Sequence, residues 1–234
     1  MPRPAPYIRT VQMIVGPTPG ELSADEVVDA YPWPEGRRWV RAMMVTTLDG
    51  AAVGPDGLSG SISGEADKLV FDAVRRNADA VLIGAGTMRA ERYGPFRGRA
   101  RLAIASKTLD LPWDEPVFTE SRERPLILTG PDTDTSSVPE TCEVVTVGDE
   151  PDAFLTALED RGLARIVCEG GPMLLGGLVS HGLVDEADIT VSPTMSGNEH
   201  SPDAPTLSDV AKFELVHLLT EDGFLMGRYV RAGG

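Results

Sequence analysis

Positive charge is scarce in this sequence of 234 residues. Its 21 lysines and arginines face 36 aspartates and glutamates, which gives a formal net charge of −15. Nucleic acids and anionic membrane surfaces repel a protein this acidic, so we expect neither as a partner. No apolar run approaches the roughly 20 residues of a membrane-spanning helix. The proline-rich start also does not have the pattern of a signal peptide, and we therefore expect a cytoplasmic protein.

Cysteine and histidine are scarce as well. The two cysteines, Cys142 and Cys168, form no CxxC pair and lie in or beside apolar stretches, which predicts buried, reduced thiols. The three histidines are scattered without metal-ligand spacing, so we predict no metal site. Walker loops, GxSxG nucleophile motifs and zinc-deaminase signatures are also absent, which removes several common enzyme classes.

Short apolar segments alternate with helical patterns through most of the chain. The predicted strands are 39–46, 79–84, 101–106, 125–129, 142–147 and 164–168, and predicted helices begin near residues 65, 151 and 172. Two further strands are predicted around the turn at Asp222 and Gly223. This alternation predicts the α/β class, with a mostly parallel sheet between helical layers and an antiparallel C-terminal hairpin.

The first 38 residues differ from the rest in their high proline content. We interpret residues 1–38 as an N-terminal arm and 39–234 as one domain. The arm has one predicted helix, 23–30, with Ser23 as its N-cap and Glu26 completing a capping box. We expect the remainder of the arm to be irregular and to cover part of a partner subunit or the active-site mouth.

Four motifs follow predicted strands, at the sheet edge where ligands of parallel sheets bind. They are Asp49-Gly50, "GAGT" at 84–87, Ser106-Lys107 and "EGG" at 169–171. Glycines let the backbone approach a phosphate, and a helix start offers free N–H groups. A structural turn explains either glycine motif alone equally well. Two such turns at one edge favour the pyrophosphate of a dinucleotide.

The charge near Ser106 and Lys107 indicates which dinucleotide binds. A hydroxyl and a cation at this strand end suit the 2′-phosphate of NADP better than the free ribose of NAD. From Arg89 to Lys107 the chain has six bases and one acid, Glu91, and such a basic island suits a small anionic ligand. A solvated basic loop is the alternative.

Two carboxylates, Asp49 and Glu169, follow apolar strands at the same edge. A carboxylate there can stabilise a protonated carbon–nitrogen double bond during hydride transfer, or deliver its proton. We therefore predict both as catalytic residues. For Asp49, a simple turn residue before Gly50 is the alternative.

Several longer segments together resemble the pyrimidine reductase of riboflavin biosynthesis, the reductase half of the bifunctional deaminase–reductase. They are "MVTTLDGAAV", "ISGEADKLVFDAVRRNADAVLIGAGTMRAE", "LAIASKTLDLP" and "CEGGPMLLGGLVSHGLVDEADITVSPTMSGN". The resemblance covers about residues 39 to 231. It implies a dihydrofolate-reductase-like fold, NADPH as cofactor, a homodimer, and reduction of the ribosyl group of 5-amino-6-(5-phosphoribosylamino)uracil. The deaminase half has no counterpart in the sequence, so the expected activity is reduction alone.

The resemblance also implies site residues. The positions implied for NADPH are Thr47, Gly84, Gly86, Thr87, Ser106, Lys107, Gly170, Gly171, Pro172 and Met173. Ser63, Glu91 and Arg92 are implied for the substrate, beside Asp49 and Glu169.

The chain departs from the family pattern at 90–95, where "AERYGP" replaces "ADDP" in a loop that holds the substrate's ribose phosphate in the family. Two alternatives therefore stay open: a reductase of another heterocycle such as dihydrofolate, and an NADPH-binding protein without catalysis. For dihydrofolate, Glu65 or Asp67 would supply the proton-relay acid.

Overall fold

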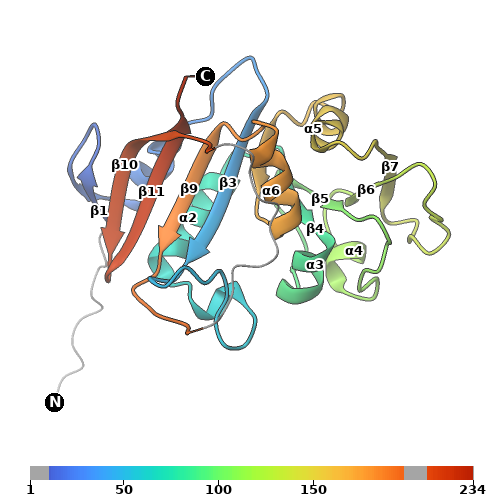
Figure 1. Cartoon of the computed structure of the whole chain (residues 1–234), viewed down its shortest axis with the longest axis horizontal. Coiled ribbons are helices and arrows are strands. Elements are labelled where there is room, and N and C mark those ends of the chain that lie inside the picture. Colours follow the sequence, from blue (N-terminus) through green and yellow to red (C-terminus); the bar gives the residue numbers. More distant parts are fainter. Residues whose placement is uncertain (1–10, 198–209, 234) are drawn as a thin grey trace.

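A single eleven-stranded sheet organises the protein, in the order β2-β1-β10-β11-β9-β3-β8-β4-β5-β6-β7 (Figure 1). The computed structural model describes residues 11–197 and 210–233. The strands are β1 (Val11–Val15), β2 (Gly20–Leu22), β3 (Trp39–Thr46), β4 (Ala80–Gly84), β5 (Arg101–Ala105), β6 (Leu126–Thr129), β7 (Glu143–Thr146), β8 (Arg165–Cys168), β9 (Glu186–Val191), β10 (Phe213–Glu221) and β11 (Phe224–Arg231). The helices are α1 (Ala24–Asp29), α2 (Glu65–Arg76), α3 (Ala85–Glu91), α4 (Pro116–Thr119), α5 (Pro151–Glu159) and α6 (Pro172–Ser180), with a 3-10 turn η1 (Ser59–Ser61).

The sheet has a parallel and an antiparallel part. Strands β9, β3, β8, β4, β5, β6 and β7 pair in parallel. Strands β9, β11, β10, β1 and β2 pair in antiparallel fashion. The predicted α/β class, with a mostly parallel centre and an antiparallel C-terminal hairpin, is confirmed. Asp222 and Gly223 both have positive φ, as the tight turn of that hairpin requires.

Helices cover both faces of the parallel part. The apolar stripe of α2, including Val70 and Val74, is buried with Met43 and Val167 on one face. Met88 of α3 and Phe118 of α4 are buried against strands on that same face. On the opposite face, Leu155 of α5 and Leu178 of α6 pack against residues of β3, β4 and β8. The edge that carries the strand ends therefore lies between two helical layers.

The N-terminal arm contributes to the sheet instead of being irregular. Strand β1 pairs with β10, and β2 pairs with β1. The predicted capping box is confirmed, because the Ser23 and Glu26 side chains each accept a hydrogen bond from the other residue's backbone N–H. Arg41 of β3 is fully buried and donates hydrogen bonds to the carbonyls of Tyr31 and Pro32. These contacts fix the described part of the arm on the α2 face.

The cysteines that the sequence predicts to be buried thiols can be located in the structure. Cys142 and Cys168 are both buried and free. Within 11–197 and 210–233, no helix is long and apolar enough to cross a membrane. The same residues contain no group of three or more His, Cys, Asp or Glu side chains arranged to hold a metal ion.

Candidate active site

The four sequence motifs lie together at the carboxyl ends of β3, β8, β4 and β5, which are adjacent in the sheet. Two cavities open along this edge. The first, which we call the central cavity, has a volume of about 400 Å³ and extends from β3 to α3. The second, the outer cavity, has a volume of about 600 Å³ and extends from α3 and α6 to the ends of β5, β6 and β7. Gly86, Gly171 and Pro172 line both, so the two cavities meet at these residues.

The two glycine turns at this junction are bonded to each other. The Gly84 N–H donates to the Gly170 carbonyl at 2.9 Å, and the Gly171 N–H donates to Thr87 Oγ1 at 2.8 Å. Gly170 and Gly171 have φ of +95° and +27°, a region that favours glycine. A Cβ on Gly171 would lie 3.3 Å from Thr87 Oγ1. The turns therefore need glycine both for their backbone shape and for their close approach.

The outer cavity receives most of the residues predicted for the cofactor. Gly84, Ser106, Lys107 and Met173 line it, besides the shared Gly86, Gly171 and Pro172. Ser106 is buried, and its hydroxyl accepts a hydrogen bond from Leu109 N–H. Thr87 and Gly170 line the central cavity instead.

Two residues of the outer cavity were missed from the sequence. Thr129 ends β6; its side chain is buried and its hydroxyl has no hydrogen-bond partner among the described residues. A buried hydroxyl left without a partner is costly, and a bound ligand would satisfy it. Asp149 also lines the cavity, and its carboxylate lies 3.5 Å from the Lys107 ammonium. Neither had a motif to mark it, because a threonine closing an apolar strand and an acid in a loop are common.

The predicted basic island between Arg89 and Lys107 is divided in space. Only Arg89 and Lys107 line the outer cavity. The side chains of five of its six bases form ion pairs: Arg89 with Asp110, Arg97 with Glu120, Arg99 with Asp79, Arg101 with Glu143, and Lys107 with Asp149. The island is therefore mostly a set of ion pairs, with two cations facing a possible anion.

Glu169 lines the central cavity, and its carboxylate has two side-chain partners. Arg75 of α2 donates from Nε and Nη2 to the two carboxylate oxygens, each at 2.5 Å, and the Tyr93 hydroxyl donates to Oε2 at 3.1 Å. The guanidinium of Arg75 also stacks on the Phe71 ring, 4.4 Å from its centroid. The Glu169 side chain is only 2% exposed. Its carboxylate is therefore held in one orientation on the cavity wall.

This network changes the acid–base behaviour of its members. Burial, together with the negative charge of Glu169, raises the pKa of Tyr93 well above its usual value, so the phenol stays protonated near neutral pH. Burial alone would lower the pKa of Arg75, but the facing Glu169 carboxylate outweighs it and the pKa is raised. Arg75 and Tyr93 were missed because an arginine on a helix usually faces solvent, and their contacts with Glu169 span 94 and 76 residues.

Asp49 lies outside both cavities and is exposed. Its carboxylate accepts hydrogen bonds from the Thr47 hydroxyl and from the N–H groups of Ser196 and Gly197. These bonds, that from Thr47 foremost, lower the pKa of Asp49 to about 2. Thr47 is buried and also lies outside both cavities. The two residues tie the end of β3 to the loop after β9.

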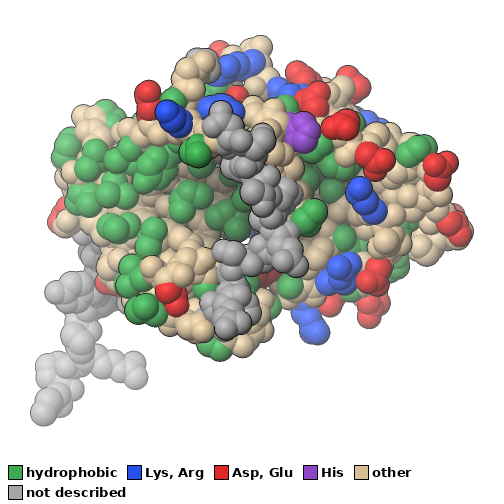
Figure 2. All heavy atoms as spheres, in the orientation of Figure 1, with side chains coloured by type: hydrophobic (Ala, Val, Ile, Leu, Met, Phe, Trp, Pro, Cys, Tyr) green, Lys and Arg blue, Asp and Glu red, His purple; other side chains and the backbone are tan. Residues whose placement is uncertain are grey.

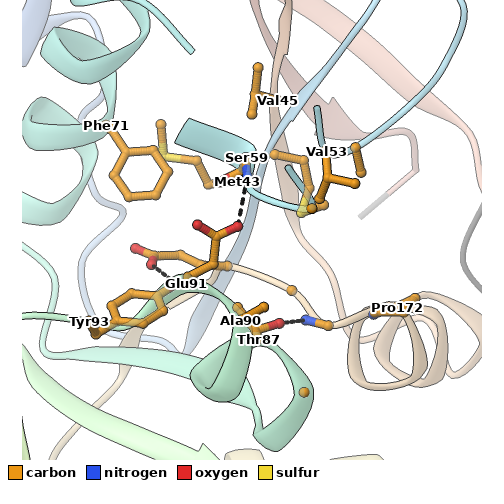
Figure 3. A pocket seen from close by; sticks show the side chains of 17 residues that line it. Met43, Val45, Val53, Ser59, Phe71, Thr87, Ala90, Glu91, Tyr93 and Pro172 are labelled. Carbon is orange, nitrogen blue, oxygen red and sulfur yellow. Dashed lines mark hydrogen bonds between the residues drawn. The ribbon is translucent and has the colours of Figure 1, made fainter. Parts of the chain in front are cut away.

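The three residues predicted to bind the substrate lie in different places in the structure. Glu91 lines the central cavity and accepts a hydrogen bond from Ser59 N–H at 2.8 Å (Figure 3). Arg92 is exposed and ends α3 with a positive φ of 47°. Ser63 donates to the buried Asp67 at 2.6 Å, and neither residue lines the central cavity. Only Glu91 is therefore positioned to contact a ligand there directly.

Comparison with known proteins agrees with this architecture. The family model described as the RibD C-terminal domain matches residues 38–223. A 2,5-diamino-6-ribosylamino-4(3H)-pyrimidinone 5′-phosphate reductase of Archaeoglobus fulgidus is 26% identical over 204 residues, covering 76% of this chain and 89% of the relative.

Two solved structures share the fold. A diaminohydroxyphosphoribosylaminopyrimidine deaminase/5-amino-6-(5-phosphoribosylamino)uracil reductase from Thermotoga maritima has a TM-score of 0.69 at 21% identity, covering 84% of this chain and 57% of that one. Dihydrofolate reductase from Enterococcus faecalis, complexed with NADP(H), has a TM-score of 0.52 at 12% identity, covering 83% of this chain and 96% of that one. The expected dihydrofolate-reductase-like fold is therefore confirmed.

Proposed function

The chain belongs to the RibD C-terminal domain family, and on that premise we propose that it is an NADPH-dependent reductase of riboflavin biosynthesis. Its substrate would be a ribosylaminopyrimidine 5′-phosphate, whose ribosyl group becomes ribityl. One observation carries the proposal: two cavities meet at Gly86, Gly171 and Pro172, one lined by two cations and a single acid and the other by two carboxylates among the described residues. Such a junction brings two ligands into contact, as hydride transfer requires.

The outer cavity fits a dinucleotide. Its volume of about 600 Å³ lies in the range of small-molecule sites. Helix α6 begins there, and the first-turn N–H groups at Met173 and Leu174 suit a pyrophosphate. The unpartnered hydroxyl of Thr129 and the cations of Arg89 and Lys107 would hold the adenosine end and its 2′-phosphate. When bound, NADPH would supply the hydride.

Glu169 is the proposed catalytic carboxylate. Opening of the ribosyl ring gives a carbon–nitrogen double bond at C1′, and its protonated form is the better hydride acceptor. A carboxylate at the cavity wall stabilises this positive charge, and Arg75 fixes its position, so little reorganisation is needed. Asp49 would contribute indirectly, by holding the loop after β9 through its hydrogen bonds to Ser196 and Gly197.

A parallel activity assay tests the proposal against its alternatives. We would follow NADPH oxidation with the ribosylaminopyrimidine phosphate and with dihydrofolate as separate substrates. The proposal expects saturable oxidation with the pyrimidine and a kcat/KM at least tenfold above that for dihydrofolate. Oxidation with dihydrofolate alone would support the pterin reductase. NADPH binding with no oxidation by either substrate would support a binding protein.

We also propose a homodimer. Outside the region covered by α5 and α6, the front of the sheet carries an apolar surface over β1, β10, β11 and β9 (Figure 2). Ile14, Leu215 and Leu225 are among its exposed members. The surface lies on a face of the sheet. A second copy is the proposed cover, and light scattering showing only a 25 kDa species at low micromolar concentration would refute it.

The cytoplasm remains the proposed location. The two cysteines are buried and free, which suits a reducing compartment. The proposed binding partner is a small heterocyclic substrate, and we propose no nucleic-acid or membrane partner.

A further inference from the structure

A further cavity lies at the amino ends of β5, β6 and β8, on the edge of the sheet opposite the candidate active site. We call it the arginine cavity; its volume is about 330 Å³, and its lining residues are Gly98, Arg99, Arg101, Arg122, Glu123 and Leu163. None of these six residues lines the outer or the central cavity. The five residues of β5 separate the two edges of the sheet by about 16 Å. The arginine cavity is therefore a separate place on the molecule.

Two carboxylates beside this cavity are each shared by two arginines. The groups are Asp79 with Arg99 and Arg165, and Glu143 with Arg101 and Arg161. The hydrogen bond from Arg101 lowers the pKa of Glu143. Burial would raise the pKa of Asp79, but hydrogen bonds from Arg165 and Arg99 outweigh it and the pKa is lowered. Both acids are therefore ionised near neutral pH, and the groups joined by these pairs carry two positive charges in excess.

Arg122 is the arginine of this cavity that is most available to a ligand. Its side chain is 68% exposed, and its Nε lies 3.9 Å from Glu123 Oε1, beyond hydrogen-bond distance. Arg101, in contrast, is 17% exposed and donates hydrogen bonds to the Arg124 carbonyl and to Glu143. A guanidinium has five N–H donors in a planar fork. Arg122 can therefore turn its fork to a ligand while Arg101 stays fixed in the wall.

We propose that the arginine cavity binds the phosphate group of a small phosphorylated molecule. The planar fork of a guanidinium matches the oxygens of a phosphate, and such charge-assisted hydrogen bonds are strong. A phosphate monoester carries about two negative charges near neutral pH, which balance the excess positive charge around the cavity. The volume of about 330 Å³ is at the lower end for small-molecule sites, which suits a phosphate with a small group attached.

The charge of the whole chain favours a small ligand over a long polyanion. With a net charge of −15, the protein repels a nucleic acid that extends beyond the cavity. A small anion responds mainly to charges within a Debye length, about 8 Å at physiological salt, and here the nearby groups are arginines. This inference is independent of the proposed function, since it uses no residue of the candidate active site.

Calorimetry with pyrophosphate as the probe tests the site. Pyrophosphate should bind saturably at low salt, and more weakly as the salt is raised. Arg122→Gln removes the available fork and should weaken binding about tenfold. Glu123→Gln removes the one acid among the described lining residues and should tighten binding about threefold, because its charge no longer opposes the anion. A merely structural ion pair would not give opposite effects on binding in the two variants.

Arg76→Gln is the matched control. Arg76 is also an exposed arginine, at 58%, and its Nη1 lies 3.8 Å from Asp25 Oδ1, yet it lines none of the three cavities. Its substitution removes the same charge and should leave pyrophosphate binding unchanged. Thermal melting of each variant checks that it is folded, and pyrophosphate should raise the melting temperature of the native protein more than that of Arg122→Gln.

Two further arms identify the place and the source of the phosphate. Lys107→Ala removes a cation of the outer cavity and should leave the binding that Arg122→Gln weakens unchanged. Ribose 5-phosphate that binds more tightly than inorganic phosphate would support a phosphate ester as the ligand, and equal affinities would support the free anion. No saturable binding up to about 10 mM, equal losses in Arg122→Gln and Arg76→Gln, or a loss in Lys107→Ala alone would overturn the inference.

Discussion

The outer and central cavities share one sheet edge and three residues, yet they differ in charge. Among its described lining residues, the outer cavity has two cations, Arg89 and Lys107, and one acid, Asp149. Among its described lining residues, the central cavity has two carboxylates, Glu91 and Glu169, and no cation. A phosphorylated dinucleotide suits the first environment, and a donor-rich heterocycle with a cationic reaction intermediate suits the second. We therefore propose that charge, more than shape, determines which of the two ligands each cavity binds.

The two cavities also differ in how their polar groups are held. In the central cavity, Arg75 and Tyr93 hold the Glu169 carboxylate through partly buried hydrogen bonds. In the outer cavity, Lys107 and Asp149 are 80% and 87% exposed, so their attraction is screened by solvent. We therefore propose that the central cavity is preorganised for chemistry, whereas the outer cavity can exchange a weak internal ion pair for a bound phosphate.

The largest expected effect comes from the shared junction. Gly171→Val places a branched side chain at φ +27° against Thr87, in the wall common to both cavities. We expect at least a hundredfold loss of NADPH affinity, with the protein still folded at a cost of about 1–3 kcal/mol from backbone strain. Calorimetry and thermal melting measure the two quantities.

Gly162→Val is the matched control for that strain. Gly162 also has a positive φ, +75°, but a Cβ there meets nothing within 4 Å and the residue lines neither cavity. The Gly162→Val variant should lose a similar amount of stability to Gly171→Val and should bind NADPH normally. Normal binding by Gly171→Val itself would mean that the turn is only structural.

The next largest effect distinguishes the two predicted catalytic carboxylates. Glu169→Gln removes the charge that faces the reaction, and turnover should fall about a hundredfold with NADPH affinity retained. Asp49→Asn changes an exposed carboxylate outside both cavities, so turnover should fall by less than about fivefold, within the usual range for loss of a surface hydrogen bond. Steady-state kinetics on the two variants, with melting curves as a check on folding, gives the comparison. Equal losses would return Asp49 to a direct catalytic role.

A smaller effect is expected at the exposed ion pair of the outer cavity. Lys107→Ala should weaken NADPH binding about tenfold by removing a charge beside the 2′-phosphate, and should leave NADH nearly unchanged. Asp149→Asn should act in the opposite direction, by a few-fold, because Lys107 then loses its competing partner. Both effects should shrink as salt is raised. Identical changes for NADPH and NADH would place Lys107 away from the 2′-phosphate.

The smallest effect concerns pH and stability. The pKa of Asp49 is about 2 in the folded protein, below the value of about 3.9 expected when unfolded. Its stabilisation is therefore complete above about pH 4 and is lost as the pH falls through about 2. Urea unfolding of the native protein and Asp49→Asn should show a constant difference from pH 7 to 5, which narrows below pH 4. A difference that changes between pH 5 and 7 would contradict the hydrogen-bonded state of Asp49.

The sequence predicted the parallel core because buried strands there alternate with amphipathic helices. Val70 and Val74 mark the inner face of α2 by spacing alone, and Gly84 and Gly171 mark two strand ends. The strands β1 and β2 were missed, since their segments are short, flanked by prolines and partly exposed. Pairing with β10, about 200 residues later, makes β1 a strand, and pairing with β1 makes β2 one.

The site was less predictable than the fold, because its contacts also join residues that are far apart in the sequence. The sequence predicted that Glu169 follows a strand. It could not predict the partners Arg75 and Tyr93, because these contacts depend on how α2 and the loop after α3 pack against the end of β8. Asp49 has an equally clear position after a strand and lies outside both cavities. A motif thus indicates the edge of the sheet, and packing decides which side chains face a cavity.

Isotope transfer tests the central claim most directly, namely that the ligands of the two cavities meet and exchange a hydride at their junction. The protein would be incubated with the ribosylaminopyrimidine phosphate and NADPH deuterated on the transferred position of the nicotinamide, in ordinary water. The account predicts that the ribityl product carries one deuterium at the former C1′, detected by mass spectrometry. A ribityl product without deuterium, or consumption of NADPH with no ribityl product, would contradict it.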